Sequence, residues 1–427
     1  MAFAHVLLLA TSSSVINTVC LIGCVLILIL YMIQAFVVWR YWRAVNKDLV
    51  KEKRRDYQPD VTILLCLRGR DPYLDDCLQA LLSQTYDDFR LCCVFDSPLD
   101  PARDTVRKFE KTPLLEIFVC EQHRDTCSLK CNSLIEVINS WQHDPELIVL
   151  VDADAVVDQH WLPDLVAPLA DASVVAVSGN RWFLPESTSL GSDVRAIWNM
   201  GAAPQMHLYE MTWGGSLAIR SQFVRSSGLL DLWAKSLFED ASVGSLVKKN
   251  RKRVHLIPSL LIPNRESTTM QGASGFITRQ LLDMRLYHGS FPMVVGHCWL
   301  TSLAIVAGSI GMAVSVFLSA WFCVYALLVC SFLMTAFYGI TWWSLNRVAG
   351  KALRARGHDA PVVKFTEVPW RNILVTQAIY TCSVIAACLK KCVVWRGVQY
   401  NVRGAQQVQM LEYRPMRASS DDVSTSL

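Results

Sequence analysis

The chain has 427 residues, of which 52% are hydrophobic and only 18% are charged. An ordinary soluble domain carries about 25% charged residues, and together with a mean hydropathy of +0.28 this argues against a disordered protein and against a simple soluble enzyme. The net charge of +4 is small for this length, so nucleic acid binding has no support in the composition. The 15 cysteines are scattered and form no disulfide framework or zinc pattern, which favours reduced thiols in a reducing compartment.

The first apolar segment predicts a membrane anchor. Residues 15–39 contain no charged side chain, and a membrane-spanning helix needs about 20 apolar residues. Basic residues follow from Arg40 to Arg55, whereas a cleaved signal peptide has its basic residues first. We therefore expect residues 1–55 to form a retained anchor with a basic juxtamembrane segment, whose C-terminal side faces the cytoplasm.

Residues 56–290 have ordinary globular composition and alternate short apolar runs with helical patterns. We expect strands at residues 61–67, 89–95, 115–120 and 147–151, with helices at residues 73–83, 104–111 and 130–141 between them. This alternation predicts right-handed crossovers and an α/β domain with a mostly parallel sheet. In such sheets, ligands bind at the carboxyl ends of the strands, which is where Arg68, Asp96 and the pair Asp152 and Asp154 fall.

The sequence Asp152-Ala-Asp154 is the strongest indication of chemistry. Two carboxylates two residues apart at a strand end can hold Mg²⁺ or Mn²⁺, which favour hard oxygen ligands; the alternative is a solvated turn. Asp96, at the end of the second strand, suits the base or ribose of a nucleotide, or else it is a turn residue before Pro98.

Further candidate residues lie near the end of the globular segment. Asp240, in the pair Glu239-Asp240, is either a helix cap or a general base that takes a proton from an attacking hydroxyl. The segment Trp213-Gly-Gly-Ser lets the backbone approach a ligand closely, or it is a plain tight turn. Arg279-Gln280 precedes the next apolar block, where an arginine would meet a phosphate or lipid headgroups.

The C-terminal third predicts a second membrane region. Residues 291–346 carry no formal charge and are long enough for two spans, and a basic segment at residues 347–371 reads as a cytoplasmic loop. A shorter apolar stretch at residues 373–389 is either a third span, against the positive-inside rule, or a re-entrant or interfacial segment. We assign residues 291–393 to the membrane region and residues 394–427 to a C-terminal segment with a disordered tail.

The order of these motifs resembles the family 2 glycosyltransferases, and most closely their ceramide glucosyltransferase branch. The resemblance covers about residues 15–405 and rests on the segments Arg68-Gly-Arg-Asp-Pro, Val94-Phe-Asp-Ser-Pro-Leu-Asp-Pro, Lys130-Cys-Asn-Ser-Leu and Trp395-Arg-Gly-Val-Gln-Tyr. It implies a GT-A-like nucleotide-sugar-binding domain with one N-terminal and two or three C-terminal transmembrane helices.

The resemblance also implies a role for each matching position. Asp240 would be the catalytic base, and Asp154 with Asp152 would bind Mg²⁺ or Mn²⁺ and the diphosphate. The donor-binding positions would be Arg68, Gly69, Asp96, Lys130, Asp152, Arg279 and Gln280. The acceptor-side positions would be Trp213, Gly214, Gly215 and Glu239, and the candidates in the C-terminal segment are Trp395, Arg396 and Tyr400.

One element departs from the family pattern. The Q/R-x-x-R-W element that closes over the diphosphate lacks its second arginine and its tryptophan, both in the register that starts at Arg279 and in the one that starts at Gln280. Contact with the diphosphate would then come from Arg279, Arg285 or Arg396, or would be weak.

We therefore expect a multi-pass membrane glycosyltransferase with a cytoplasmic catalytic domain. It would move a sugar, a hexose in our expectation, from a UDP-sugar to a lipid hydroxyl with inversion. Two alternatives keep the same core: a processive polysaccharide synthase, and a non-catalytic nucleotide-sugar-binding membrane protein. A transporter is disfavoured because the apolar segments lack buried charges and inverted repeats.

Overall fold

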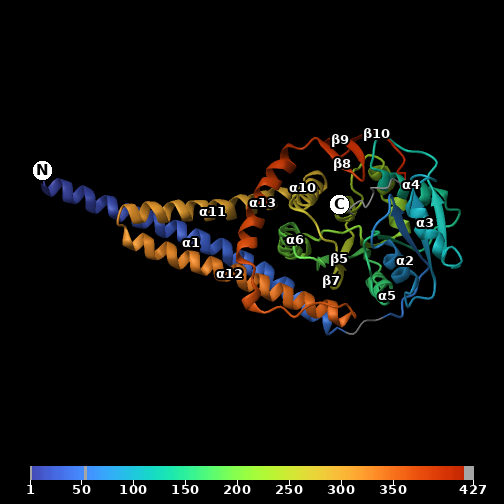
Figure 1. Cartoon of the computed structure of the whole chain (residues 1–427), viewed down its shortest axis with the longest axis horizontal. Helices are drawn as coiled ribbons and strands as arrows, with labels where there is room; N and C mark the ends of the chain where they lie inside the picture. Colours follow the sequence, from blue (N-terminus) through green and yellow to red (C-terminus); the bar gives the residue numbers. More distant parts are fainter. Residues whose placement is uncertain (1, 52–54, 418–427) are drawn as a thin grey trace.

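The computed structural model describes residues 2–51 and 55–417 as a rounded α/β body from which long helices extend to one side (Figure 1). Residues 52–54, in the basic juxtamembrane segment, and residues 418–427, in the expected disordered tail, lie outside the described residues.

The body is built on a mixed sheet of seven strands in the order β3-β2-β1-β4-β6-β5-β7. The strands are β1 (Val61–Leu67), β2 (Phe89–Phe95), β3 (Leu115–Val119), β4 (Leu147–Val151), β5 (Val174–Phe183), β6 (Ser216–Arg220) and β7 (Arg253–Asn264). Strand β6 runs antiparallel to its neighbours β4 and β5, and the other pairs are parallel. The expected mostly parallel α/β sheet is confirmed.

The sheet is covered by helices on both faces, which explains its continuous apolar strands. One face packs against α2 (Leu74–Leu82), α3 (Ala102–Val106) and α5 (Trp161–Val166). The other packs against α4 (Leu129–Ser140), α7 (Ser221–Ser226), α8 (Leu229–Trp233) and α9 (Asp240–Lys249). The helix expected at residues 104–111 is instead the short α3, followed by a 3₁₀-helix at Arg107–Phe109.

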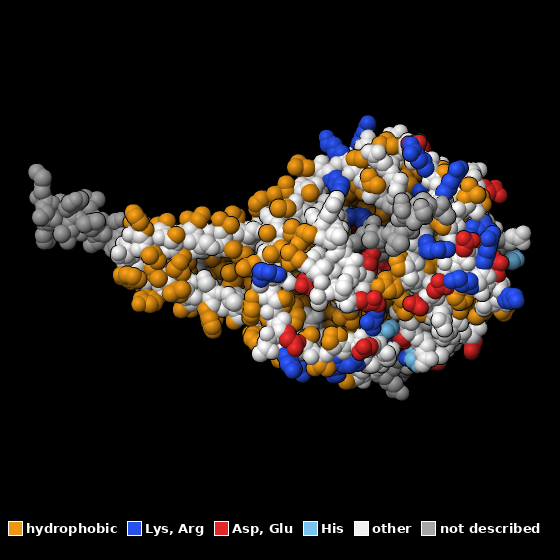
Figure 2. Space-filling view, viewed as in Figure 1, with side chains coloured by type: hydrophobic (Ala, Val, Ile, Leu, Met, Phe, Trp, Pro, Cys, Tyr) orange, Lys and Arg blue, Asp and Glu red, His pale blue; other side chains and the backbone are white. Residues whose placement is uncertain are grey.

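Four helices have the length and composition to cross a membrane: Val15–Leu49 within α1 (Ala2–Leu49), α11 (Phe291–Phe317), α12 (Trp321–Ala355) and α13 (Trp370–Leu389). Hydrophobic side chains cover the part that projects from the body (Figure 2). The structure thus has the expected N-terminal apolar helix and three C-terminal ones. Residues 373–389, for which the sequence left open whether they form a third span, make up most of α13.

Helix α12 continues into the segment that we expected to be a loop. Its last turns remain helical to Ala355 because Val348, Ala349 and Leu353 are buried against Tyr41 of α1. The side chain of the following Arg356 is only 6% exposed, and it ties this end of the helix to the α/β body. Its Nε and Nη1 atoms donate to Asp158 at 2.6 Å and to Asp164 at 2.8 Å.

Helix α13 packs against α10 (Met270–Tyr287) and α6 (Leu190–Tyr209). Arg285 of α10 donates to the carbonyl oxygens of Cys388 at 2.7 Å and Lys390 at 3.1 Å. It therefore satisfies carbonyl groups at the C-terminal end of α13. The sequence left Arg285 open as one of three possible contacts with a diphosphate. The structure does not place it on the lining of the cavity at the carboxyl ends of the strands.

The chain ends in a second sheet, which consists of β8 (Cys392–Trp395), β9 (Val398–Gly404) and β10 (Gln407–Glu412) in antiparallel order. Its buried Tyr400 and Val402 pack against Leu129, Leu237 and Leu282 of the body. This packing brings the turn between β8 and β9 to the ends of the large sheet's strands.

Candidate active site

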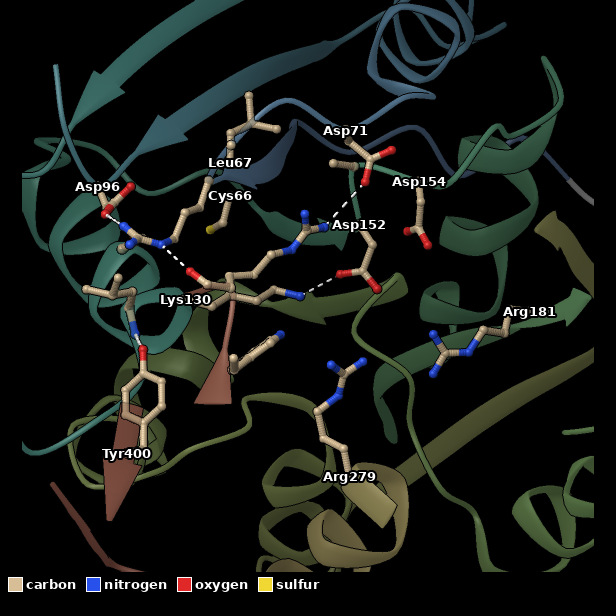
Figure 3. Close-up of a pocket in the computed structure, with 17 residues that line it drawn as sticks. Cys66, Leu67, Asp71, Asp96, Lys130, Asp152, Asp154, Arg181, Arg279 and Tyr400 are labelled. Atoms are coloured by element: carbon tan, nitrogen blue, oxygen red, sulfur yellow. Dashed lines mark hydrogen bonds and ion pairs between the residues drawn. The ribbon is translucent and has the colours of Figure 1, made fainter. Parts of the chain in front are cut away.

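A cavity of about 140 Å³ lies at the carboxyl ends of β1, β2 and β4 (Figure 3). The following predicted positions line it: Arg68, Gly69, Asp96, Lys130, Asp152, Asp154, Arg279, Trp395, Arg396 and Tyr400. Asp71 and Arg181 line it as well, and sequence reasoning missed both. Because side chains from seven separate segments meet here, the cavity is the leading candidate for a ligand site in this body.

Three arginines from different elements border this cavity. Arg181 comes from β5, Arg279 from α10, and Arg396 from the tight turn between β8 and β9. Burial, together with Arg181 and Arg396, lowers the pKa of Arg279 to about 10. Among the described residues, neither Arg181 nor Arg279 is paired with a carboxylate, and Nη1 of Arg396 is buried without a hydrogen-bond partner. Guanidinium groups with unused hydrogen-bond donors favour a bound anion such as a diphosphate.

Asp71, Asp152 and Asp154 line the same cavity, where Asp71 accepts from Arg396 Nη2 at 3.3 Å. Burial, then repulsion from Asp152 and Asp71, raises the pKa of Asp154 to about 6. Asn264 holds this carboxylate in place by donating to its Oδ2 at 2.8 Å. Although burial opposes it, the Lys130 ammonium lowers the pKa of Asp152.

Asp152 and Asp154 are candidate metal ligands. Within residues 2–51 and 55–417, no group of three or more His, Cys, Asp or Glu side chains is arranged as a metal site. The repulsion between Asp152 and Asp154 in a buried cavity is, however, the setting that a divalent cation relieves. Their oxygen ligands therefore fit Mg²⁺ or Mn²⁺, which take one or two carboxylates plus phosphate oxygens.

Lys130 bridges the half-buried Asp152 and the buried Glu239. Its Nζ lies 2.6 Å from Asp152 Oδ1 and 2.6 Å from Glu239 Oε1. Burial alone would lower the pKa of Lys130, but the two carboxylates raise it well above its usual value. Glu239, which the resemblance put on the acceptor side, thus lies against Lys130 and fixes its position.

The segment Trp213–Gly215 runs between the acids. Gly214 N donates to Asp240 Oδ2 at 2.9 Å. A Cβ atom on Gly214 would lie 2.2 Å from Glu239 Oε1, and one on Gly215 would lie 2.7 Å from Asp152 Oδ2. Both positions therefore need glycine because carboxylates approach the backbone closely.

Replacing Gly215 with alanine is expected to reduce activity more than tenfold. The added methyl group would meet the Trp213 ring at 2.1 Å as well as Asp152, so the turn must shift, and a shift of about 1 Å at a reacting centre can cost about 100-fold. Gly275→Ala is the matched control, since a Cβ there meets nothing within 4 Å. The measurement is sugar transfer by the two purified variants, and equal activity would contradict the prediction.

One end of the cavity is formed around Asp96. Arg68 makes an ion pair with this carboxylate, and Tyr413 donates to the Asp96 carbonyl oxygen at 3.1 Å. The Tyr413 ring stacks on His123 with a centroid separation of 3.8 Å. Oδ1 of Asp96 is buried without a hydrogen-bond partner in the described part of the chain, and it is therefore available to accept from a ligand.

A second, larger cavity of about 580 Å³ leads away from Asp240. Its lining comes from α6 and α10 of the body and from the apolar helices α1, α11, α12 and α13. Trp213 and Gln280 line this cavity and not the smaller one, and Arg181 lines both. The two cavities thus adjoin at Arg181, and Asp240 lines the larger one. Sequence reasoning did not predict the larger cavity.

Comparison with known proteins identifies the family. The profile described as Glycosyl transferase family 21 matches residues 19–408. The chain belongs to glycosyltransferase family 21. This is the ceramide glucosyltransferase family, so the protein is a hexosyltransferase with a GT-A-like fold. No curated protein matched the sequence.

The solved structures that match this chain include the following three. The mannosyltransferase PcManGT from Pyrobaculum calidifontis, in complex with GDP-Man and Mn²⁺, is 16% identical with a TM-score of 0.45, over 86% of this chain and 99% of that one. GalNAc-T7 with UDP, GalNAc and Mn²⁺ is 10% identical with a TM-score of 0.38, over 56% and 49%. TarS 1-349 of S. aureus is 11% identical with a TM-score of 0.37, over 83% and 99%.

In this family 21 enzyme, the structure shows where the residues of the incomplete Q/R-x-x-R-W element lie. In the register that starts at Arg279, Leu282 stands in place of the second arginine, and it is buried beneath the C-terminal sheet. Arg181 of β5 supplies a further guanidinium on the donor cavity. The one indication of it in the sequence is a charged side chain near the end of an otherwise buried strand.

Proposed function

We propose that this enzyme transfers a hexose from a UDP-sugar to the hydroxyl of a membrane lipid, with inversion at the anomeric carbon. One observation supports the proposal most strongly. A small cavity lined by arginines and carboxylates adjoins a large cavity between apolar helices at Arg181, and Asp240 lines the large one. A nucleotide diphosphate suits the first cavity, and an amphiphile suits the second.

On the donor side, Arg181, Arg279 and Arg396 would hold the diphosphate. Asp96 would accept a hydrogen bond from the base or ribose through its free Oδ1. Asp152 and Asp154 would hold Mg²⁺ or Mn²⁺, which when bound offsets negative charge on the diphosphate leaving group. Lys130 and Asn264 would keep these two carboxylates oriented.

On the acceptor side, the hydrocarbon of the lipid would occupy the large cavity, with its hydroxyl group next to Asp240. The carboxylate takes the hydroxyl proton while the acceptor oxygen bonds to the anomeric carbon from the face opposite the diphosphate. The bond from that carbon to the diphosphate breaks, so UDP leaves as an anion and the configuration is inverted. The N–H groups of Gly214 and Ala241 fix the orientation of Asp240.

The chain organisation follows from this scheme. We propose that residues 56–290 form the catalytic domain, between an anchor at residues 1–55 and a membrane region at residues 291–393, followed by a C-terminal segment at residues 394–427, of which Trp395, Arg396 and Tyr400 line the donor cavity. The basic residues near both membrane segments support a cytoplasmic catalytic domain.

The proposal is tested by UDP release from the purified full-length protein, incubated with a panel of UDP-hexoses in the presence of Mn²⁺. UDP release is expected to require the addition of vesicles made from a membrane lipid extract. Binding of a UDP-sugar without lipid-dependent release would favour a non-catalytic nucleotide-sugar-binding protein and contradict the proposal.

Filling the large cavity is expected to weaken acceptor binding selectively. Gly201 of α6 lines this cavity, and a Cβ there would meet nothing within 4 Å. Gly201→Leu should therefore raise the acceptor KM about tenfold, equivalent to ~1.4 kcal/mol, with the donor KM unchanged. Gly275→Leu, also in open space but not on the lining, is the control. Steady-state kinetics with both substrates varied measures the difference, and a donor effect as large as the acceptor effect would contradict this assignment.

A further inference from the structure

Asp283 is an acidic residue on the large cavity that the scheme above does not use. It lies on α10 one helical turn after Arg279, in the position where the family pattern has tryptophan. It lines the same cavity as Asp240. Its Oδ1 is buried without a hydrogen-bond partner among the residues that the structure describes.

The surroundings of Asp283 disfavour a charged carboxylate. Its helix neighbours Leu281, Leu282 and Met284 are buried. Burial, with the like charges of Asp240 and Glu239, raises its pKa well above the usual value. A buried carboxyl group without a partner is destabilising, and a leucine would suit this face of the helix better. The carboxyl group is accounted for if a ligand supplies its partner.

Several other polar side chains on the lining already have partners within the protein. Thr212 donates to the Asp240 carbonyl at 2.8 Å, and Asn199 donates to the Arg181 carbonyl at 3.2 Å. Gln377 donates to Thr301 at 3.0 Å and to Ser302 at 2.9 Å. Gln34 Nε2 and His297 Nδ1 on this lining also lack a partner among the described residues, and Asp283 differs from them because it is an acid close enough to feel the charge of Asp240.

We propose that Asp283 is a specificity-determining residue that binds a second polar group of the acceptor. This inference rests on the proposed function. The lipid would carry a hydrogen-bond donor next to its reacting hydroxyl: the reacting group faces Asp240, and the neighbouring one donates to Asp283. A lipid whose polar group is a single alcohol would leave the buried carboxyl unpaired, and the enzyme would use it poorly.

The test compares two acceptors of equal chain length, a long-chain 1-alkanol and the corresponding 1,2-alkanediol, with the full-length enzyme in nanodiscs. The wild-type enzyme should prefer the diol in kcat/KM by about tenfold to a hundredfold, because the single alcohol leaves a buried polar group without a hydrogen-bond partner. Asp283→Leu should bring the ratio close to one, chiefly by lowering use of the diol. Asp283→Asn, which keeps an acceptor oxygen and the side-chain shape, should give an intermediate ratio. Asp231→Leu removes an exposed acid outside both cavities and should keep the wild-type ratio.

The other possible outcomes overturn either the role of Asp283 or the proposed function. A wild-type ratio near one, or a ratio that Asp283→Leu leaves unchanged, overturns the role of Asp283. Loss of turnover with both acceptors in Asp283→Asn would make Asp283 part of the proton-transfer machinery and would also overturn it. If the wild-type enzyme used neither probe but still released UDP with a lipid extract, this inference would fall and the proposed function would stand. If no lipid supported UDP release, the proposed function would fall.

Discussion

Asp240→Asn is expected to lower sugar transfer by about 10²- to 10⁴-fold, the usual contribution of a general base. An amide cannot take up the hydroxyl proton as the acceptor attacks. Its oxygen can still accept the hydrogen bond that Gly214 N donates to Asp240 at 2.9 Å, so the turn should keep its shape. Since Asp240 does not line the smaller cavity, affinity for the UDP-sugar should stay within about twofold, which is ~0.4 kcal/mol.

Two measurements on this variant separate catalysis from binding. Turnover with saturating substrates reports the proton transfer, and calorimetric titration with a UDP-sugar reports the donor site. Asp231→Asn, at an exposed position, serves as the control and should behave as wild type in both. Normal turnover in Asp240→Asn would remove Asp240 from the mechanism.

Lys130→Met is expected to have the largest effect on stability. Its Nζ lies 2.6 Å from both Asp152 and Glu239, so its loss leaves two acids without their shared cation. Breaking a buried ion pair by removing one partner costs about 3–5 kcal/mol. Donor binding should fall as well, because Asp152 loses the group that orients it. Thermal unfolding followed by tryptophan fluorescence, in the same detergent for all variants, measures the loss.

A compensating variant tests the cause. Lys130→Met combined with Glu239→Gln removes one of the two stranded charges, so it should recover part of the lost stability. The single variant Glu239→Gln should be milder than Lys130→Met, because Lys130 keeps Asp152 as a partner. If the double variant were less stable than Lys130→Met alone, the effect would come from lost packing and not from the unpaired acids.

The sheet could be predicted from the sequence because its strands are buried on both faces. Such strands read as continuous apolar runs, as in Leu147–Val151, and the polar residue after each run marks the end where ligands bind. Arg68, Asp96 and Asp154, far apart in the chain, line one cavity for this reason. The weaker predictions concerned short helices such as α3, because five residues are too few to show a helical pattern of apolar side chains.

Other parts of the site depend on packing that no local pattern records. Arg181 reaches the donor cavity because β5 lies in the second half of the sheet, which the alternation of strands and helices did not define. Arg285 lies near the family's closing element but out of register with it, and the end of α13 lies beside it and accepts its hydrogen bonds. The large cavity is formed by helices from both ends of the chain, so only their assembly reveals it.

The central claim is that a UDP-sugar and a membrane lipid meet at Asp240. The most direct measurement is the identity of the product formed from ¹³C-labelled UDP-hexose and a lipid extract, determined by mass spectrometry with NMR of the new glycosidic bond. We predict a lipid that carries one labelled sugar, with the anomeric configuration opposite to that of the donor. A labelled polymer, free sugar alone, or a product with retained configuration would contradict this account.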